Sequence, residues 1–362
     1  MRLVSPLLKH VIYPGLSKAG YLRRAAGTGP AVLTYHGVLP AGYSVVDPAL
    51  DGNLVSADSF RRQLTFLKGQ YNVISPEEFL LWCEAGHELP PRSVLLTCDD
   101  GMRNSLSDML PFLQEAGLTC LFFVTGASLA DTPTMLWYEE LYLMFLAGPE
   151  NFTLELLEIG LQAHADRREK RSLWWELVKK LSFYDSDRRR TLLERIRMQL
   201  GLSEQWDAEY RGDPAGKRFL VLNQTELRQL ASAGMCIGAH TSSHPMLSHL
   251  PPELAWSEIS GTKHNLEQTL GKKIWALAYP FGDSLSVTSR EIQMAERAGF
   301  QCAFLNLGGG FGLQTPKFAL PRVHVTAEMT LAEFEAHISG FHRSLQNLFR
   351  PTNLSAAVES NA

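Results

Sequence analysis

The architecture of this chain is best indicated by one segment, Leu95-Leu96-Thr97-Cys98-Asp99-Asp100-Gly101. An apolar run that ends in two carboxylates and a glycine is typical of a buried strand that stops at a polar edge. Side chains of successive strand residues point to opposite faces, but beyond the strand end, with a permissive glycine next, both aspartates can face one pocket. One carboxylate could then bind a metal while the other acts as a base. The alternative is that the pair caps the next helix.

A second cluster lies far downstream, at Ile237-Gly238-Ala239-His240-Thr241-Ser242-Ser243-His244-Pro245. Two histidines four residues apart are expected on one side of a helical turn, where they can present two nitrogens to one metal. The same spacing occurs in zinc metalloproteases, but there a glutamate occupies the position of Thr241. The absence of that general base argues against this class of protease. Together with Asp99 and Asp100, the histidine pair indicates a metal centre.

Short apolar runs alternate with amphipathic segments along most of the chain, which favours parallel βα units. Strands are predicted at 31–35, 93–98, 119–124, 235–239, 275–279 and 302–305. Helices are predicted at 56–68, 105–116, 225–233, 252–270, 289–298 and 331–345. Most of the polar motifs follow directly after an apolar run. In a parallel barrel that position is the carboxyl-end rim, where active sites are built.

Five motifs resemble those of the polysaccharide deacetylases, the NodB-homology group also called carbohydrate esterase family 4. The two strongest are Thr97 to Gly101 and His240 to His244, and the supporting ones are Leu33 to Val38, Ala278 to Gly282 and Leu320 to Val325. The resemblance covers residues 30 to 345 with one interruption. It implies an α/β fold, a distorted and incomplete (β/α) barrel, carrying a helical insertion.

The predicted domain organisation has four parts. Residues 1–28 form an N-terminal amphipathic leader, 29–346 the catalytic domain, and 347–362 a polar tail, while 138–216 form the helical insertion. The leader has apolar residues at helical spacing among basic ones. A helix packed against the domain is the favoured interpretation, and a basic anchor on a membrane surface is the alternative.

Composition narrows the classes of partner and the compartment. The formal net charge of −4 argues against a dedicated nucleic-acid binder. The five cysteines include no Cys-x-x-Cys pair, so nothing requires an oxidising compartment. No uninterrupted apolar region typical of a signal peptide is present near the N-terminus. We therefore expect a cytoplasmic protein, with peripheral association with the inner membrane as the anchor alternative.

The resemblance also implies the roles of individual residues. Asp100, His240 and His244 would bind a divalent metal and leave coordination open for water and substrate, as a catalytic zinc site requires. Zn²⁺ is expected, although Co²⁺ and Ni²⁺ accept the same ligands. Asp99 would act as general base on the attacking water. The candidates for the general acid are His324 and, second, His36, for which a purely structural role is the alternative.

The third motif departs from the family pattern and prompts two hypotheses. Ala278 stands near the position where many members carry an arginine that braces the catalytic aspartate, so we expect Arg322 to take over that task. The predicted substrate contacts are Tyr279, Pro280, Phe281 and Trp137, with a backbone N–H near Phe281 as a further donor to the oxyanion.

The predicted function is metal-dependent removal of N-acetyl or O-acetyl groups from a saccharide. Its expected setting is bacterial exopolysaccharide or glycoconjugate metabolism, by resemblance alone. Two alternatives remain. One is an amidohydrolase of the same fold that acts on a non-sugar amide, and the other is an inactive glycan-binding protein.

Overall fold

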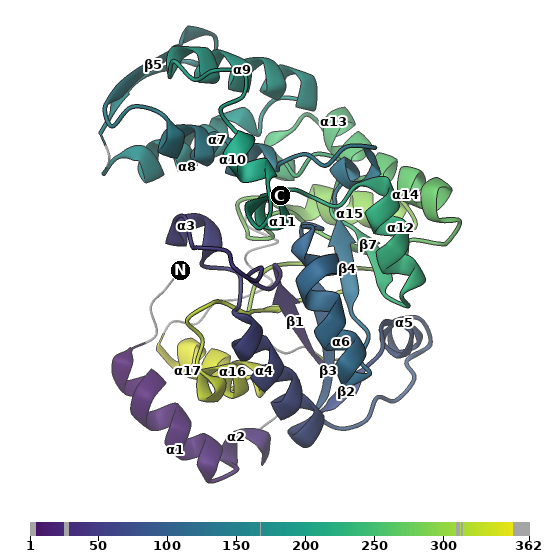
Figure 1. Ribbon diagram of the computed structural model, residues 1–362. Coiled ribbons are helices and arrows are strands. Elements are labelled where there is room, and N and C mark those ends of the chain that lie inside the picture. Colours follow the sequence, from purple (N-terminus) through teal and green to yellow (C-terminus); the bar gives the residue numbers. More distant parts are fainter. Residues whose placement is uncertain (1–4, 25–28, 167, 309–311, 313, 350–362) are drawn as a thin grey trace.

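A parallel β-sheet forms the centre of the molecule (Figure 1). The computed structural model describes residues 5–24, 29–166, 168–308, 312 and 314–349. Within them the sheet order is β10-β1-β3-β4-β7-β8-β9, with β2 beside β3. The strands are β1 (Ala31–Tyr35), β2 (Asn72–Ile74), β3 (Ser93–Cys98), β4 (Leu121–Val124), β7 (Cys236–Ala239), β8 (Ala276–Ala278), β9 (Cys302–Phe304) and β10 (Val323–His324). The sheet curves into an incomplete barrel, which confirms the predicted fold class.

Strand register brings the motifs to one edge of this sheet. Tyr35 on β1 is paired with Cys98 on β3, so His36 and Asp99 leave their strands side by side. Val124 on β4 is paired with Ala239 on β7, and His240 follows directly. Because all these pairs are parallel, the residues that follow each strand emerge at the same carboxyl edge.

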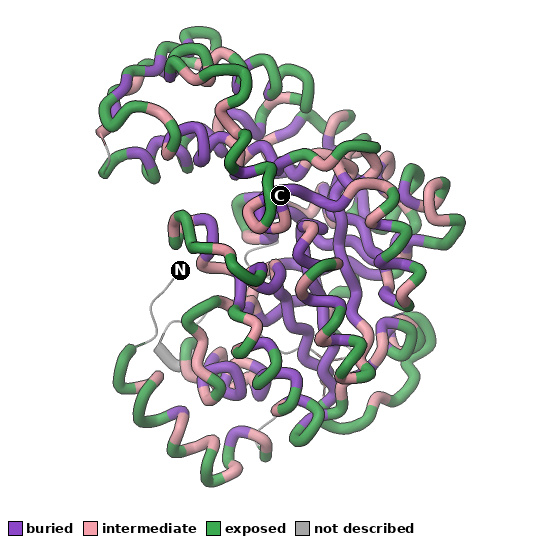
Figure 2. The backbone as a smooth tube through the Cα atoms, in the orientation of Figure 1, coloured by how far each residue is buried: buried purple, intermediate pink, exposed green. Residues whose placement is uncertain are grey.

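Helices cover the outer face of the sheet, and apolar side chains fill both sides of it. The covering helices are α4 (Ala57–Gln70), α5 (Pro76–Ala85), α6 (Leu110–Ala116), α12 (Gln224–Ser232), α13 (Pro252–Trp256), α14 (Thr262–Leu270), α15 (Ser289–Arg297), α16 (Leu331–Ile338) and α17 (Phe341–Phe349). Figure 2 shows the strands as almost continuously buried. The helix predicted over 331–345 is divided at Gly340, which has φ +74°. Helical hydrogen bonding is interrupted by such a left-handed residue.

The segment from 138 to 216 folds into a separate layer above the carboxyl edge (Figure 1). Its elements are α7 (Trp137–Ala147), β5 (Phe152–Leu156), β6 (Leu161–Ala165), α8 (Lys170–Leu181), α9 (Ser186–Gln199), α10 (Ala208–Arg211) and α11 (Ala215–Phe219). The antiparallel hairpin β5–β6 was not predicted, although its burial alternates residue by residue along β5. A separate apolar core, contributed largely by α7, α8 and α9, stabilises this layer.

One face of the N-terminal segment packs against the domain. The helices α1 (Tyr13–Lys18) and α2 (Tyr21–Arg24) bury Tyr13 and Leu22 against α16, and Arg23 pairs with Glu335 at 2.8 Å. The side chains of Leu7 and Val11 are about 60% exposed. No helix within the described ranges has the length and apolarity needed to cross a bilayer. Residues 1–4, 25–28 and 350–362 of the predicted leader and tail lie outside the described residues.

Candidate metal and hydrolase site

The two aspartates turn into one pocket because the backbone reverses directly after β3. Asp99 is the first residue past the strand, and both Asp100 and Gly101 have positive φ, at +74° and +69°. A Cβ on residue 101 would also lie 3.0 Å from the Val124 side chain. Glycine is therefore required here for conformation and for space.

The histidine pair lies on an irregular loop, and the predicted helical turn is wrong. Thr241 and His244 both have positive φ, at +62° and +53°, which an α-helix does not contain. The Thr241 hydroxyl accepts a hydrogen bond from the His244 amide, and Glu258 accepts one from the Ser243 amide at 2.8 Å. These two bonds hold the loop in a shape that brings both rings together. A spacing of four residues could not distinguish this loop from a helix.

Asp100, His240 and His244 have the donor set and spacing of a metal site. Oδ1 of Asp100 lies 3.4 Å from Nε2 of His240 and 3.3 Å from Nε2 of His244. Two ligands of a tetrahedral zinc lie roughly 3.4 Å apart. Nδ1 of His240 donates to the Ala278 carbonyl at 2.7 Å, which directs its other nitrogen to the aspartate. The residues present therefore fit a divalent cation.

The charges at these three residues are set by burial and by their neighbours. Burial alone would raise the pKa of Asp100, but hydrogen bonds from His240 and His244 outweigh it and hold that pKa well below its usual range. Burial lowers the pKa of His244. For His240, burial also acts to lower the pKa, but Asp100 and Asp99 reverse the sign and raise it. An ionised carboxylate between two imidazoles suits a cation.

Arg322 braces Asp99 through two hydrogen bonds. Its Nη1 donates to Oδ1 at 2.7 Å and its Nη2 to Oδ2 at 2.6 Å, and both side chains are at most 3% exposed. Burial would raise the pKa of Asp99, but Arg322, followed by His240, lowers it below the usual value. The bidentate geometry fixes the carboxylate plane next to Asp100. This is the contact expected of an arginine that replaces the one missing near Ala278.

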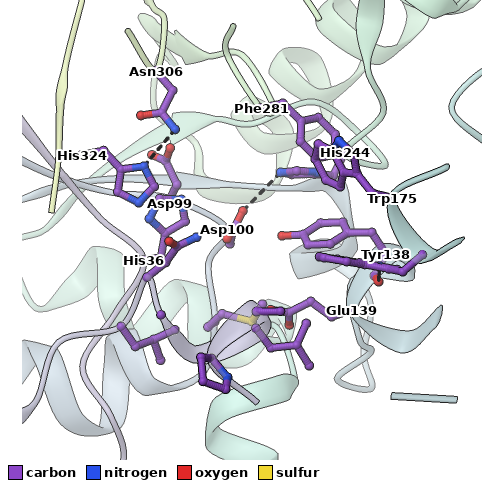
Figure 3. Close-up of a pocket in the computed structure, with 18 of the residues that line it drawn as sticks. His36, Asp99, Asp100, Tyr138, Glu139, Trp175, His244, Phe281, Asn306 and His324 are labelled. Atoms are coloured by element: carbon purple, nitrogen blue, oxygen red, sulfur yellow. Dashed lines mark hydrogen bonds and ion pairs between the residues drawn. The ribbon is translucent and has the colours of Figure 1, made fainter. Parts of the chain in front are cut away.

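His36 and His324 lie beside Asp99 as a stacked pair, with ring centroids 4.7 Å apart (Figure 3). Asn306 donates to Nδ1 of His324 at 3.2 Å, so neutral His324 carries its proton on Nε2. Burial and then His36 lower the pKa of His324 to about 3. His324 is therefore neutral at pH 7. In the free protein its Nε2–H can donate a hydrogen bond, but the ring lacks the additional proton that a general acid would transfer.

The predicted substrate contacts of the third motif do not all face the pocket. Tyr279 is 1% exposed, and its hydroxyl donates to the Phe318 carbonyl at 3.1 Å, so its side chain belongs to the core. Pro280 is buried and does not line the cavity. Phe281 does line it, at φ +59°, with its ring 5.0 Å from that of His244. Tyr279 and Phe281 therefore both border the cavity, but the Tyr279 hydroxyl is already engaged in the core, whereas the Phe281 ring packs beside His244.

Trp137 is also placed differently from the prediction. It is 9% exposed, its Nε1 donates to the His244 carbonyl at 3.1 Å, and Arg189 lies over its ring. Trp137 therefore supports the loop that carries His240 and His244, which we call the metal loop, and cannot stack on a sugar. Its neighbour Tyr138 lines the cavity, with its ring 4.8 Å from that of His244. The side chains alternate because successive helix positions are about 100° apart.

These residues surround a cavity of about 770 Å³ (Figure 3). We call four of the lining residues, Asp99, Asp100, His240 and His244, together with Arg322, which lies buried against Asp99, the cavity floor. On the insertion side the wall carries Tyr138, Glu139, Arg171, Ser172, Trp174, Trp175 and Arg218. Most residues of this wall were not predicted from the sequence. Trp175 could have been, because it lies outside the apolar stripe of α8 and a large aromatic residue there indicates a contact other than the core.

A buried ion network joins the insertion to the rest of the wall. Arg218 on α11 donates to Asp51 at 2.6 Å and to Glu139 at 2.8 and 3.1 Å. Asp51 belongs to α3 (Pro48–Asp51) and Glu139 to α7. Burial lowers the pKa of Arg218, but Glu139 and Asp51 outweigh it and raise that pKa above its usual range. The insertion is thereby tied to the β1–α4 connection beside the site.

Backbone strain is concentrated at this site. Five non-glycine residues in the described ranges have positive φ, namely Arg92, Asp100, Thr241, His244 and Phe281. Four of the five line or support the cavity floor. Such conformations cost of order 1–3 kcal/mol each and persist where the surroundings impose them, most often at functional sites.

Comparison with known proteins agrees with this geometry. The family model for polysaccharide deacetylase matches residues 202–303, which include both metal-site histidines. YxkH of Bacillus subtilis (strain 168), whose own designation as a polysaccharide deacetylase is provisional, is 26% identical over 117 residues. The resemblance to the polysaccharide deacetylases is confirmed. The match spans 32% of this chain and 41% of YxkH, and the family-model match lies beyond most of the insertion.

Solved structures show the same fold over most of the chain. The deacetylase PplD of Streptococcus pyogenes, in complex with acetate, superposes with a TM-score of 0.55 at 17% identity, covering 86% of this chain and 98% of PplD. IcaB of Ammonifex degensii gives 0.54 at 17% identity, covering 87% and 98%. At this identity the likeness establishes the fold, the incomplete (β/α) barrel of NodB type.

Proposed function

We propose that this protein removes acetyl groups from a carbohydrate by metal-dependent hydrolysis. One observation carries the proposal. A carboxylate braced for catalysis, Asp99, lies directly beside the three-ligand set of Asp100, His240 and His244 at the bottom of a cavity. The family resemblance supports an acetylated saccharide as the substrate.

The metal would be held by Asp100, His240 and His244. A divalent cation there, with Zn²⁺ expected and Co²⁺ or Ni²⁺ acceptable to the same ligands, would polarise the acetyl carbonyl and acidify water. Asp99 is ionised at neutral pH because Arg322 offsets its burial, so it can accept the proton of the attacking water. Arg322 is a positioning residue, since it acts through Asp99.

His324 and the aromatic residues Phe281 and Tyr138 would contact the substrate. Nε2–H of His324 has no hydrogen-bond partner among the described residues, which leaves it free to bind the acetyl group or the leaving atom. His324 must gain a proton before it can act as a full acid. Phe281 and Tyr138 exclude water and pack against the substrate. A backbone N–H near Phe281 remains our proposed second donor to the oxyanion.

We also propose a bacterial exopolysaccharide or glycoconjugate as the biological substrate. A cytoplasmic location, with peripheral membrane association through the N-terminal segment, stays a prediction.

The test is acetate release from a panel of N- and O-acetylated saccharides, by metal-loaded wild type beside Asp99→Asn. Asn keeps the size of the side chain and removes the base, so we expect at least a hundredfold loss of kcat, and chelation should abolish release. Equal rates for Asp99→Asn and wild type would overturn the mechanism. Turnover of a non-sugar acetamide in place of every saccharide would support the amidohydrolase alternative.

A control variant separates chemistry from folding. Asp108→Asn removes a half-buried carboxylate from the helical segment Ser105–Met109 that follows the aspartates, where Asp108 accepts a hydrogen bond from the Ala41 amide, and it should leave acetate release unchanged. Metal binding is measured separately by calorimetry. If wild type binds metal and glycan tightly but releases no acetate, the inactive glycan-binding alternative is favoured.

A further inference from the structure

The wall of the cavity formed by α8 differs chemically from the cavity floor. Arg171, Ser172 and Trp175, which we call the α8 face, are all exposed and all line the cavity. Arg171 and Trp175 are four residues apart, so they lie on the same side of the helix. The buried stripe of α8, which includes Leu173 and Leu177, faces the insertion core instead, and Trp174 belongs to that core while also bordering the cavity.

Trp175 is the first unusual member of the α8 face. Its side chain is 38% exposed, although an indole is among the costliest groups to leave in water. Its ring lies 5.8 Å from that of Phe281, which in turn lies 5.0 Å from the metal-site ring of His244. Figure 3 shows these aromatic side chains on one side of the cavity. Trp175 is thus one ring removed from the metal site, the place of a sugar unit next to the acetylated one.

Arg171 is the second unusual member of the α8 face. The carboxylates that line the cavity are engaged: Asp99 by Arg322, Asp100 by two histidines, and Glu139 by Arg218. Asp283 accepts hydrogen bonds from Leu285 and Ser286. Among the described residues, no carboxylate lies within ion-pair distance of Arg171. Asp47 and Arg171 both affect the pKa of Tyr142, and Asp47 already accepts a hydrogen bond from the Tyr142 hydroxyl at 3.3 Å.

We propose that the α8 face is a subsite for an anionic sugar unit, in which Trp175 packs on the ring and Arg171 binds its carboxylate or phosphate. Guanidinium geometry suits both groups, since two parallel N–H donors match two anionic oxygens. This inference rests on the proposed function for the acetylated unit and adds the class of its neighbour. The insertion therefore selects the substrate, while the barrel edge carries the chemistry.

The test compares binding of three probes to the metal-free protein by calorimetry at constant ionic strength. The probes are a hyaluronan tetrasaccharide, in which N-acetylglucosamine alternates with a uronate, a neutral N-acetylglucosamine tetramer, and the same tetramer carrying a phosphate monoester. We expect wild type to bind at least one anionic probe about tenfold more tightly than the neutral tetramer. Preference for the uronate or for the phosphate identifies which anion the subsite takes.

Two variants assign that preference to the α8 face. Arg171→Gln should reduce the anionic-to-neutral affinity ratio about tenfold, and Trp175→Ala should weaken all three probes together. The matched controls are Arg188→Gln, an exposed arginine of α9 outside the cavity, and Phe183→Ala, an exposed aromatic of the insertion. Both controls should leave affinities and ratio as in wild type.

Equal affinity for charged and neutral probes, or an unchanged ratio in Arg171→Gln, would overturn the anionic subsite. Failure of all three probes to bind would overturn it as well. Because the readout is binding, it is independent of acetate release. A protein that discriminates the probes but releases no acetate would retain the subsite and refute the proposed function.

Discussion

At the cavity floor every charged side chain is buried and paired, whereas the α8 face carries a guanidinium and an indole that are exposed to solvent. The floor comes from residues that directly follow parallel strands, and its geometry is imposed by strand register. The α8 face comes from an insertion with its own apolar core. The contrast indicates that reaction chemistry and substrate selection are held by separate parts of the fold, joined at the Arg218 network.

The largest effect should follow from removing the brace at the cavity floor. Arg322→Ala leaves Asp99 buried without its partner, so we expect at least a hundredfold loss of kcat and about 3–5 kcal/mol of stability. The acid limb of the pH–rate profile should move to higher pH, because burial raises the pKa of Asp99 once Arg322 no longer lowers it. Arg322→Lys keeps the charge but not the two-pronged geometry, and its loss should be smaller. Unchanged turnover in Arg322→Ala would show that Asp99 needs no brace.

The next largest effect tests the junction between the two regions. Arg218→Met leaves Asp51 and Glu139 buried without their cation, and the free energy of unfolding should fall by about 3–5 kcal/mol. Arg195→Met, which breaks the more exposed pair with Glu158, is the control and should cost at most about 1 kcal/mol. Urea unfolding followed by circular dichroism measures both. Similar costs for the two variants would mean that the junction is not a stabilising unit.

Acid should weaken the fold through His324. Its pKa is about 3 in the folded protein and about 6.5 when unfolded, so the two states bind protons equally above pH 6.5. Between pH 6.5 and 3 only the unfolded state is protonated there, so stability falls by roughly 1.4 kcal/mol per pH unit from this group. His324→Asn should show a shallower dependence in metal-free protein. Carbon-13 labelling of the histidine rings should show that His324 does not titrate between pH 5 and 8; a midpoint near 6.5 would contradict this.

The smallest effect concerns support of the metal loop. Trp137→Phe keeps the ring but loses the hydrogen bond to the His244 carbonyl, which should cost about 1 kcal/mol of stability. We expect a modest loss of metal affinity, because the His244 backbone loses one restraint. Trp175→Phe is the control, since within the described part of the chain no hydrogen bond from Trp175 supports the loop, and its metal affinity should match wild type. Equal metal affinity in Trp137→Phe and Trp175→Phe would mean that Trp137 only fills space.

Local patterns predicted the floor better than the wall. The predicted strands at 31–35 and 93–98 coincide with β1 and β3, because uninterrupted apolar runs bounded by polar residues have few other interpretations. The expected helical turn at His240 is absent, since Thr241, Glu258 and left-handed backbone shape the loop. Trp137, the predicted substrate contact, is buried behind the histidine loop, whereas Trp175, for which no role was predicted, lines the cavity. The side of a helix that faces a cavity depends on what the opposite side packs against.

The amino-acid sequence by itself determined the parallel α/β architecture, the residues at the strand ends and the chemical class of the metal ligands. These depend on periodicity and on side-chain chemistry, which are local properties. Only the tertiary structure decided that Arg322 reaches Asp99 and that Arg218 joins Asp51 to Glu139. It also decided that α8 turns Arg171 and Trp175 toward the cavity. The hydrogen-bonded partners of Arg322 and Arg218 are at least 79 positions away in the sequence, and burial in a shared core, which no local pattern encodes, brings them together.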